Sequence, residues 1–305
     1  MPYLTLAIGD GANDKNMITQ ADVGVAVKGK EGSEAARVSD YVLGEFKLLS
    51  FLTLYYGREW YRKNSQLIAY NFFKNWFHVS SVIVYGAFTY FSGVLIFDIY
   101  LYEMFNLLFA ACPIIAFALF DYEYSAKQSL NAKYKEIYKS GVNNDQFNQT
   151  VYFLTIGRGF IYGLVALLAV FFLLENTVLT MDGRTGYLSQ SGSVLYFNII
   201  IIINLRILVM SNGFRPFLLI TIAWSTGIYW VMYKFFVKTI DSEMRESYYQ
   251  ELSTWNIFFV HLLLISIFIL TEFGYKKYKW YDSQLKRSPF SLVYDVFQTV
   301  SVSPN

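Results

Sequence analysis

The chain has 305 residues, of which 55% are hydrophobic and 16% are charged, and its formal net charge is +2. A soluble domain usually carries about 25% charged residues, so this composition predicts a chain that is largely embedded in a membrane. The lysines are scattered between apolar stretches rather than gathered on a basic face, which argues against nucleic-acid binding. The single cysteine, Cys112, excludes an internal disulfide.

The first fifty residues have the pattern of an α/β fold. Three short apolar runs predict strands, at residues 4–8, 23–27 and 41–43. Residues 31–39 have a helical pattern, and Asn13 is expected to cap a short helix that runs through Gln20. This is too little chain for an independent core, so we expect the last part of a larger α/β domain.

Six long apolar stretches follow, each near the ~20 residues that a helix needs to cross a bilayer. They lie at about residues 66–90, 99–120, 151–174, 194–212, 216–237 and 255–275. The sequence therefore predicts four parts: an α/β segment at 1–50, a cytosolic stalk at 51–65, a six-helix transmembrane domain at 66–275 and a cytosolic tail at 276–305.

Charge asymmetry predicts the orientation of these spans. If the α/β part is cytosolic, the cytosolic connections 121–150 and 213–215 and the tail after 275 carry ten Lys and Arg residues. The opposite loops, 91–98, 175–193 and 238–254, carry three. Because basic residues concentrate on the cytosolic side, both termini are expected there.

Residues 4–14 read as an apolar strand that ends in Gly-Asp-Gly-Ala-Asn-Asp. Ligands of open α/β sheets bind at the carboxyl ends of strands, which is where Asp10 falls. Magnesium takes one or two protein carboxylates and keeps water and phosphate oxygens, so Asp10 is expected to be a direct ligand. Asp14 would bind through water or orient the loop, and Asn13 could donate to a phosphoryl oxygen. The alternative is a plain Gly-Asp-Gly turn.

The first apolar stretch carries Asn71, Lys74, Asn75 and His78, whose i, i+3, i+4, i+7 spacing places them on one helical face. Lys74 lies ten residues beyond Asn64, about 15 Å into the bilayer. A lysine near mid-membrane is costly and predicts a functional site. The alternative is a lysine that snorkels to the cytosolic interface.

The later stretches carry three further notable features. In the second stretch, Asn106 precedes Pro113, which cannot donate to the carbonyl of Phe109. The freed carbonyl would either line a polar cavity or belong to a kink that aids packing. Arg158 and Arg206 lie toward the cytosolic half of their stretches and are expected to be structural, with side chains that snorkel.

Several of these motifs resemble a known family. Residues 9–14, 17–18, 21–25 and 39–40 resemble the hinge end of the phosphorylation domain of P-type ATPases. Residues 29–37, 57–61, 72–75 and 119–121 resemble, more narrowly, the lipid-flipping class. The resemblance runs from Leu4 to about Lys279, and Lys15 departs from it because a small or aliphatic residue is more usual there.

The resemblance implies a HAD-like α/β phosphorylation-domain fragment followed by six transmembrane helices. It implies an ATP-driven flippase that moves phospholipid from the exoplasmic to the cytosolic leaflet through an aspartyl phosphate. Asp10 and Asp14 would then serve Mg²⁺, and Asn13 and Asp14 would contact the phosphate side of ATP. Lys74 and Asn75 would line the lipid path, and we add Asn71 and Asn106 as candidates for it.

The resemblance also implies a partner and a location. The partner would be a glycosylated two-span accessory subunit. The protein would be a multi-pass protein of the plasma membrane, Golgi or endosomes, which the sequence does not distinguish.

The family's phosphorylated aspartate lies in an Asp-Lys-Thr-Gly-Thr motif, which this sequence does not contain. We therefore interpret the chain as the C-terminal portion of a pump, either a fragment or a truncated gene model, and expect it to be inactive alone. One alternative is a cation pump of the same superfamily, although the first two stretches offer no mid-membrane carboxylate. Another is a non-catalytic membrane fragment that acts as an anchor or partner.

Overall fold

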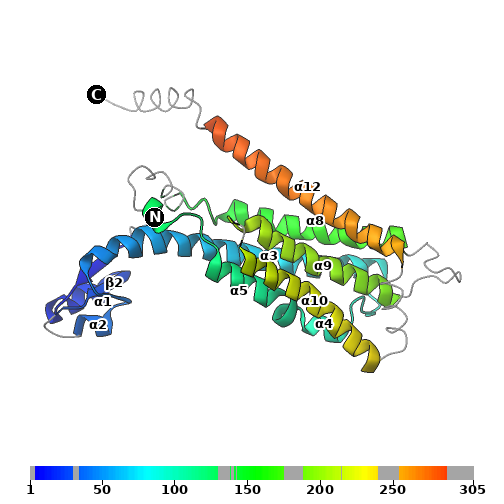
Figure 1. Cartoon of the computed structure of the whole chain (residues 1–305), viewed down its shortest axis with the longest axis horizontal. Helices are drawn as coiled ribbons and strands as arrows, with labels where there is room; N and C mark the ends of the chain where they lie inside the picture. Colours follow the sequence, from blue (N-terminus) through cyan, green and yellow to red (C-terminus); the bar gives the residue numbers. More distant parts are fainter. Residues whose placement is uncertain are drawn as a thin grey trace. The chain divides into compact units, whose positions relative to one another are not determined.

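The computed structural model describes residues 4–29, 34–129, 138, 141, 143–174, 188–213, 215–239 and 254–286 (Figure 1). The chain divides into two compact units. The first comprises Met1–Gln66 and Tyr122–Asn148, and the second comprises Leu67–Asp121 and Gln149–Asn305.

The first unit contains a three-stranded parallel sheet with strand order β1-β2-β3. The strands are β1 (Leu6–Gly9), β2 (Val23–Val27) and β3 (Tyr41–Leu43). Parallel neighbours require crossover connections, and α1 (Lys15–Gln20) and α2 (Glu34–Val38) supply them. Ile18, Ala26 and Ala35 form a small buried cluster. The two later strands are confirmed at the predicted bounds.

The predicted cap at Asn13 is wrong. Asn13 lies inside a single 3₁₀ turn, Ala12–Asp14, and the residue that precedes α1 is Asp14. The carboxylate of Asp14 turns back to the loop amides rather than forward, so the α-helix begins only at Lys15.

The first unit also holds a short charged cluster. A π-helical segment, η3 (Phe51–Gly57), leads into α3 (Arg58–Phe88), which continues into the second unit. Arg58 pairs with Glu123 at 2.7 Å, and Arg62 pairs with Glu59 at 2.9 Å. The first of these pairs ties the start of α3 to the segment that follows residue 121, where α6 (Ala126–Ser129) lies, and the second lies within α3.

The second unit is helical. The helices α8 (Gln149–Leu174), α9 (Leu188–Met210), α10 (Pro216–Thr239) and α12 (Trp255–Lys286) run alongside one another (Figure 1). Among the described residues, four helices are long and apolar enough to cross a membrane. They lie at Gln149–Leu174, Leu188–Met210, Pro216–Phe236 and Trp255–Tyr278.

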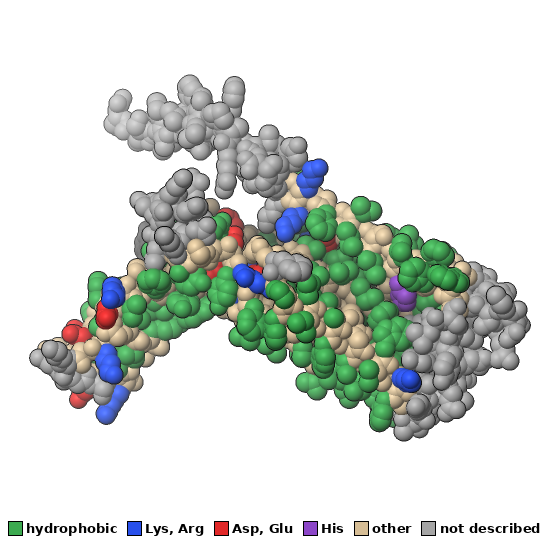
Figure 2. Space-filling view, in the orientation of Figure 1, with side chains coloured by type: hydrophobic (Ala, Val, Ile, Leu, Met, Phe, Trp, Pro, Cys, Tyr) green, Lys and Arg blue, Asp and Glu red, His purple; other side chains and the backbone are tan. Residues whose placement is uncertain are grey.

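Hydrophobic side chains cover most of the face of the helical unit that Figure 2 shows. In α9, 61% of the most apolar window is buried, against 22–33% in the other three helices, so α9 is the innermost of the four. A protein that exposes this much apolar surface on a helical bundle is suited to a lipid environment.

The remaining two predicted stretches are also helical but less regular. The stretch at 66–90 belongs to α3, which starts earlier, at Arg58, and ends at Phe88. The stretch at 99–120 is broken into α4 (Ile99–Glu103), the π-helical η4 (Phe105–Ala110) and α5 (Ala111–Phe120). Neither is among the four apolar helices that are long enough to span.

Two glycines let α8 approach α3 closely. A Cβ at Gly159 would lie 2.7 Å from the carbonyl oxygen of Phe73, and one at Gly163 would clash with Ser80. Small residues four apart are a common way for membrane helices to pack backbone to backbone. This contact fixes the middle of α3, where Lys74 lies.

Candidate functional site

The loop after β1 is organised by Asp14. Its Oδ2 accepts hydrogen bonds from the amides of Asp10, at 3.1 Å, and Gly11, at 3.3 Å. A Cβ at Gly9 would lie only 2.3 Å from Asp14 Cβ, so this arrangement requires glycine there. Asp14 therefore orients the loop, which is one of the two roles that the sequence predicted for it.

Asp10 presents a free carboxylate. It is exposed, and its side chain has no hydrogen-bond partner among the described residues. Asn13 and Lys15 are exposed beside it. Within the described ranges no group of three His, Cys, Asp or Glu side chains lies close enough to hold a metal. The donor set fits a magnesium ion that takes one carboxylate directly and completes its shell with water and phosphate oxygens.

A second contact holds the start of β1 to β2. The amide and hydroxyl of Thr5 both donate to Asp22 Oδ2, at 2.8 and 2.9 Å. These hydrogen bonds, the one from the backbone first, lower the pKa of the Asp22 carboxyl. The hydrogen bonds between Thr5 and Asp22 hold the beginning of β1, the strand whose carboxyl end carries Asp10.

Lys74 lies in the middle of α3 and is 8% exposed. Its Nζ donates to Asn106 Oδ1 at 2.7 Å and lies 5.9 Å from the centre of the Phe105 ring. Among the described residues it makes no ion pair with an acid. The ammonium group is therefore held by a neutral amide and an aromatic face, and its charge remains uncompensated.

The predicted polar face of α3 is divided between two environments. His78 is buried, and its ring lies 4.6–5.6 Å from the rings of Phe97, Tyr102, Phe105 and Tyr196. Asn71 and Asn75 are instead exposed, as is Asn106 across from them. The structure thus brings Lys74, His78 and Asn106 together and leaves Asn71 and Asn75 beside them at the surface of α3.

The carbonyl that Pro113 frees is satisfied by a neighbouring helix. The carbonyl oxygen of Phe109 accepts a hydrogen bond of 2.5 Å from Ser225 Oγ of α10. Both groups are buried, which favours packing over a polar cavity as the role of this carbonyl.

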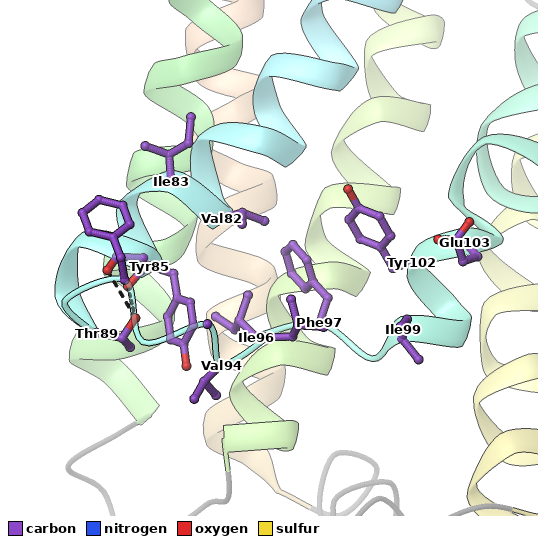
Figure 3. A pocket seen from close by; sticks show the side chains of 14 residues that line it. Val82, Ile83, Tyr85, Thr89, Val94, Ile96, Phe97, Ile99, Tyr102 and Glu103 are labelled. Carbon is purple, nitrogen blue, oxygen red and sulfur yellow. Dashed lines mark hydrogen bonds between the residues drawn. The ribbon is translucent and has the colours of Figure 1, made fainter.

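An apolar pocket of about 540 Å³ lies between the end of α3 and α4. Figure 3 shows side chains from the end of α3, from the connecting loop and from α4 around it. Val82, Tyr85, Ile96 and Phe97 line it, and Glu103 is the charged lining residue. Phe97, which lines the pocket, also lies 5.0 Å from the His78 ring.

A second charged cluster joins α8, α9 and α12. Arg158 and Arg206 each pair with one carboxylate oxygen of Glu272, and the Tyr162 hydroxyl donates to the same carboxylate at 3.2 Å. Arg158 also lies over Tyr275, and Arg206 over Phe73. The arginines are held by these contacts.

Glu272 was missed by the sequence analysis. The available signal was its position as the one acidic residue in the last apolar stretch, where a carboxylate needs a partner.

A family model and the similar proteins all indicate the same family. The sequence model described as phospholipid-translocating P-type ATPase C-terminal matches residues 36–282. A phospholipid-transporting ATPase of Schizosaccharomyces pombe is 32% identical over 280 residues, which cover 89% of this chain and 20% of the relative.

Two other relatives agree. Phospholipid-transporting ATPase 10 of Arabidopsis thaliana is 32% identical over 75% of this chain and 19% of its own length. Human phospholipid-transporting ATPase IK is 31% identical over 75% of this chain and 17% of its own length. The chain spans about a fifth of the length of these relatives. It belongs to the family of phospholipid-translocating P-type ATPases, whose C-terminal region it matches.

Proposed function

We propose that this chain forms the C-terminal part of an ATP-driven flippase that moves phospholipid from the exoplasmic to the cytosolic leaflet through an aspartyl-phosphate cycle. The observation that carries the proposal is Lys74, a buried cation in the middle of a helix whose hydrogen-bond partner, Asn106, is neutral. A phospholipid phosphate is an anion that would compensate this charge.

In this proposal the exposed amides extend the polar path along α3. Asn71, Asn75 and Asn106 offer neutral donors and acceptors beside Lys74, suited to the polar atoms of a head group. The apolar pocket beside α4 is suited to an acyl chain, because its walls are aromatic and aliphatic side chains. Head group and chain would thus meet adjacent surfaces of one segment.

Residues 1–50 are proposed to belong to a HAD-like phosphorylation domain, residues 51–65 to a stalk, 66–275 to a six-helix membrane domain and 276–305 to a cytosolic tail. The four apolar helices supply four spans, and α3 with α4–η4–α5 would supply the other two. Both termini would be cytosolic. A glycosylated two-span accessory subunit is the proposed partner.

Asp10 would hold magnesium directly, and Asp14 would keep the loop amides in place while its second oxygen stays available. Asn13 and Asp14 would contact the phosphate side of ATP. A magnesium ion held here would neutralise charge that develops during phosphoryl transfer. The support is the free, exposed carboxylate of Asp10 at the end of β1.

The ion pairs of Glu272, the acidic residue of the last apolar helix, argue against a cation pump. Glu272 is held between two guanidinium groups, which leaves it unsuited to replace the hydration shell of a cation. For the isolated chain, we expect no enzymatic activity. Hydroxylamine-sensitive phosphate on this chain alone would contradict that expectation.

The function is tested by Lys74→Ala in a complete pump that carries this region. We expect the lipid concentration for half-maximal ATPase stimulation to rise about tenfold, because a charged hydrogen bond is worth about 1.5–3 kcal/mol. Phosphorylation from ATP should continue. Lys234→Ala, which removes an exposed lysine from α10, is the matched control and should leave the curve unchanged. An unchanged curve for Lys74→Ala would leave Lys74 as a structural residue.

A further inference from the structure

The segment that carries Asn106 has an irregular backbone. Residues Phe105–Ala110 form a π-helical stretch, and Pro113 follows shortly after. Proline has no amide hydrogen, so it cannot complete the usual hydrogen bond to the carbonyl of Phe109. A π-helical stretch is rare and is frequently found at functional sites. Some other group must hold this backbone in a membrane environment.

That group is a two-step chain of side chains from neighbouring helices. Asn204 of α9 donates through Nδ2 to Ser225 Oγ at 2.8 Å. Ser225 of α10 then donates its own hydroxyl hydrogen to the carbonyl of Phe109 at 2.5 Å. Both side chains are 0% exposed, so water does not compete with either hydrogen bond. The direction of donation is thereby fixed, from amide to hydroxyl to carbonyl.

The π-helical segment Phe105–Ala110 also contacts Lys74, through Asn106. Asn106 lies three positions before Phe109, and its Oδ1 accepts from Lys74 Nζ at 2.7 Å. The segment is therefore anchored from α10 through its backbone and meets α3 through its side chain.

We propose that Ser225, oriented by Asn204, is a positioning residue for the lipid path: its hydroxyl fixes the π-helical segment so that Asn106 meets Lys74. The inference rests on the proposed function, because it gives Ser225 a role only through the lipid site. In this proposal Ser225 acts through the backbone and does not itself contact lipid.

A purely structural role for Ser225 makes a different prediction. If the hydrogen bond only stabilised the bundle, its loss would lower the melting temperature and leave the lipid concentration for half-maximal stimulation unchanged. A positioning role instead changes that concentration, since the amide that meets Lys74 moves with the backbone. Measuring both apparent lipid affinity and thermal stability therefore distinguishes the two roles.

The experiment uses Ser225→Ala in the complete pump, with ATPase activity measured against phosphatidylserine in mixed micelles. We expect the half-stimulating concentration to rise about threefold or more. Thr226→Ala is the matched control, because it removes the next hydroxyl along α10, which bonds within its own helix to Ile222 and Ala223. The control should keep the wild-type curve.

A double-mutant cycle links the effect to Asn106. If Ser225 acts through Asn106, adding Ser225→Ala to Asn106→Ala should raise the half-stimulating concentration little further. Two independent, fully additive shifts would overturn the inference. If Ser225→Ala fails to form phosphoenzyme, Asn204→Leu replaces it, with the same expectation, because it leaves Ser225 in place but unoriented.

The outcomes also separate this inference from the proposed function. If Lys74→Ala and Asn106→Ala shift the lipid curve but Ser225→Ala and Asn204→Leu do not, the inference alone is wrong. If none of the four variants shifts the curve, the proposed lipid path is wrong and the inference is overturned with it.

Discussion

The helical unit holds two buried charged clusters that differ in whether their cations pair with a carboxylate. At one, Glu272 lies between Arg158 and Arg206, and three helices share the cluster. At the other, Lys74 has a neutral amide as its hydrogen-bond partner. Taking a charge out of water is costly, and a partner of opposite sign offsets that cost. At the first cluster each cation therefore has an anionic partner within the protein, although one positive charge stays in excess, whereas Lys74 has no acidic partner among the described residues.

This difference assigns a structural role to the cluster around Glu272 and a functional role to Lys74. The carboxylate that the two arginines share joins α8, α9 and α12, which pack against one another. A cation that pairs with no carboxylate retains the stronger attraction for an anion that comes from outside the protein. The comparison therefore predicts that substitutions at Glu272 change stability, whereas substitutions at Lys74 change lipid response.

The largest effect is expected for Glu272→Ala. The substitution leaves two arginines without their shared carboxylate, which should lower the free energy of unfolding by about 3 kcal/mol. The measurement is thermal unfolding of the purified complete pump in detergent. Glu103→Ala removes an exposed acid from α4 and is the control. Equal melting temperatures for the two variants would show that the Glu272 cluster is not structural.

A smaller loss is expected for Arg206→Met. The carboxylate keeps Arg158 as a partner, and methionine fills much of the space, so we expect about 1–2 kcal/mol. The same unfolding measurement applies. A loss as large as that of Glu272→Ala would mean that the two arginines act as one unit rather than as separate partners.

The smallest effect is expected for Lys74→Arg. Arginine keeps the positive charge, but its planar guanidinium cannot reproduce the single short hydrogen bond to Asn106. The half-stimulating lipid concentration should rise about threefold, less than for Lys74→Ala. A shift as large as that of Lys74→Ala would indicate that shape, rather than charge, decides lipid affinity at this position.

The sequence predicted the parts of the fold that depend on local pattern. The strands at 23–27 and 41–43 appear at their predicted bounds, because short apolar runs between turn residues identify strands well. Helical spacing predicted that Lys74 and His78 share a face with Asn71 and Asn75; the structure buries only the first two of these. Residue spacing could not, however, identify Asn106 as the partner of Lys74, since the two lie on separate elements.

What the sequence could not predict depends on contacts between distant segments. The pairing of Glu272 with Arg158 and Arg206 joins residues more than sixty positions apart. The carbonyl of Phe109, in the π-helical stretch Phe105–Ala110, likewise accepts a hydrogen bond from Ser225, far along the chain. The cap at Asn13 was misplaced because Asp14 engages the loop amides, a competition that propensity alone does not reveal.

The most direct test makes one substitution in each cluster and measures two properties of each variant of the complete pump. Lys74→Met and Glu272→Gln are each compared with wild type for half-stimulating lipid concentration and for melting temperature. We expect Lys74→Met to raise the half-stimulating lipid concentration about tenfold and to leave the melting temperature unchanged or higher, since it removes a buried charge. Glu272→Gln should lower the melting temperature with little change in the lipid curve. A lower melting temperature for Lys74→Met with an unchanged lipid curve would contradict the account.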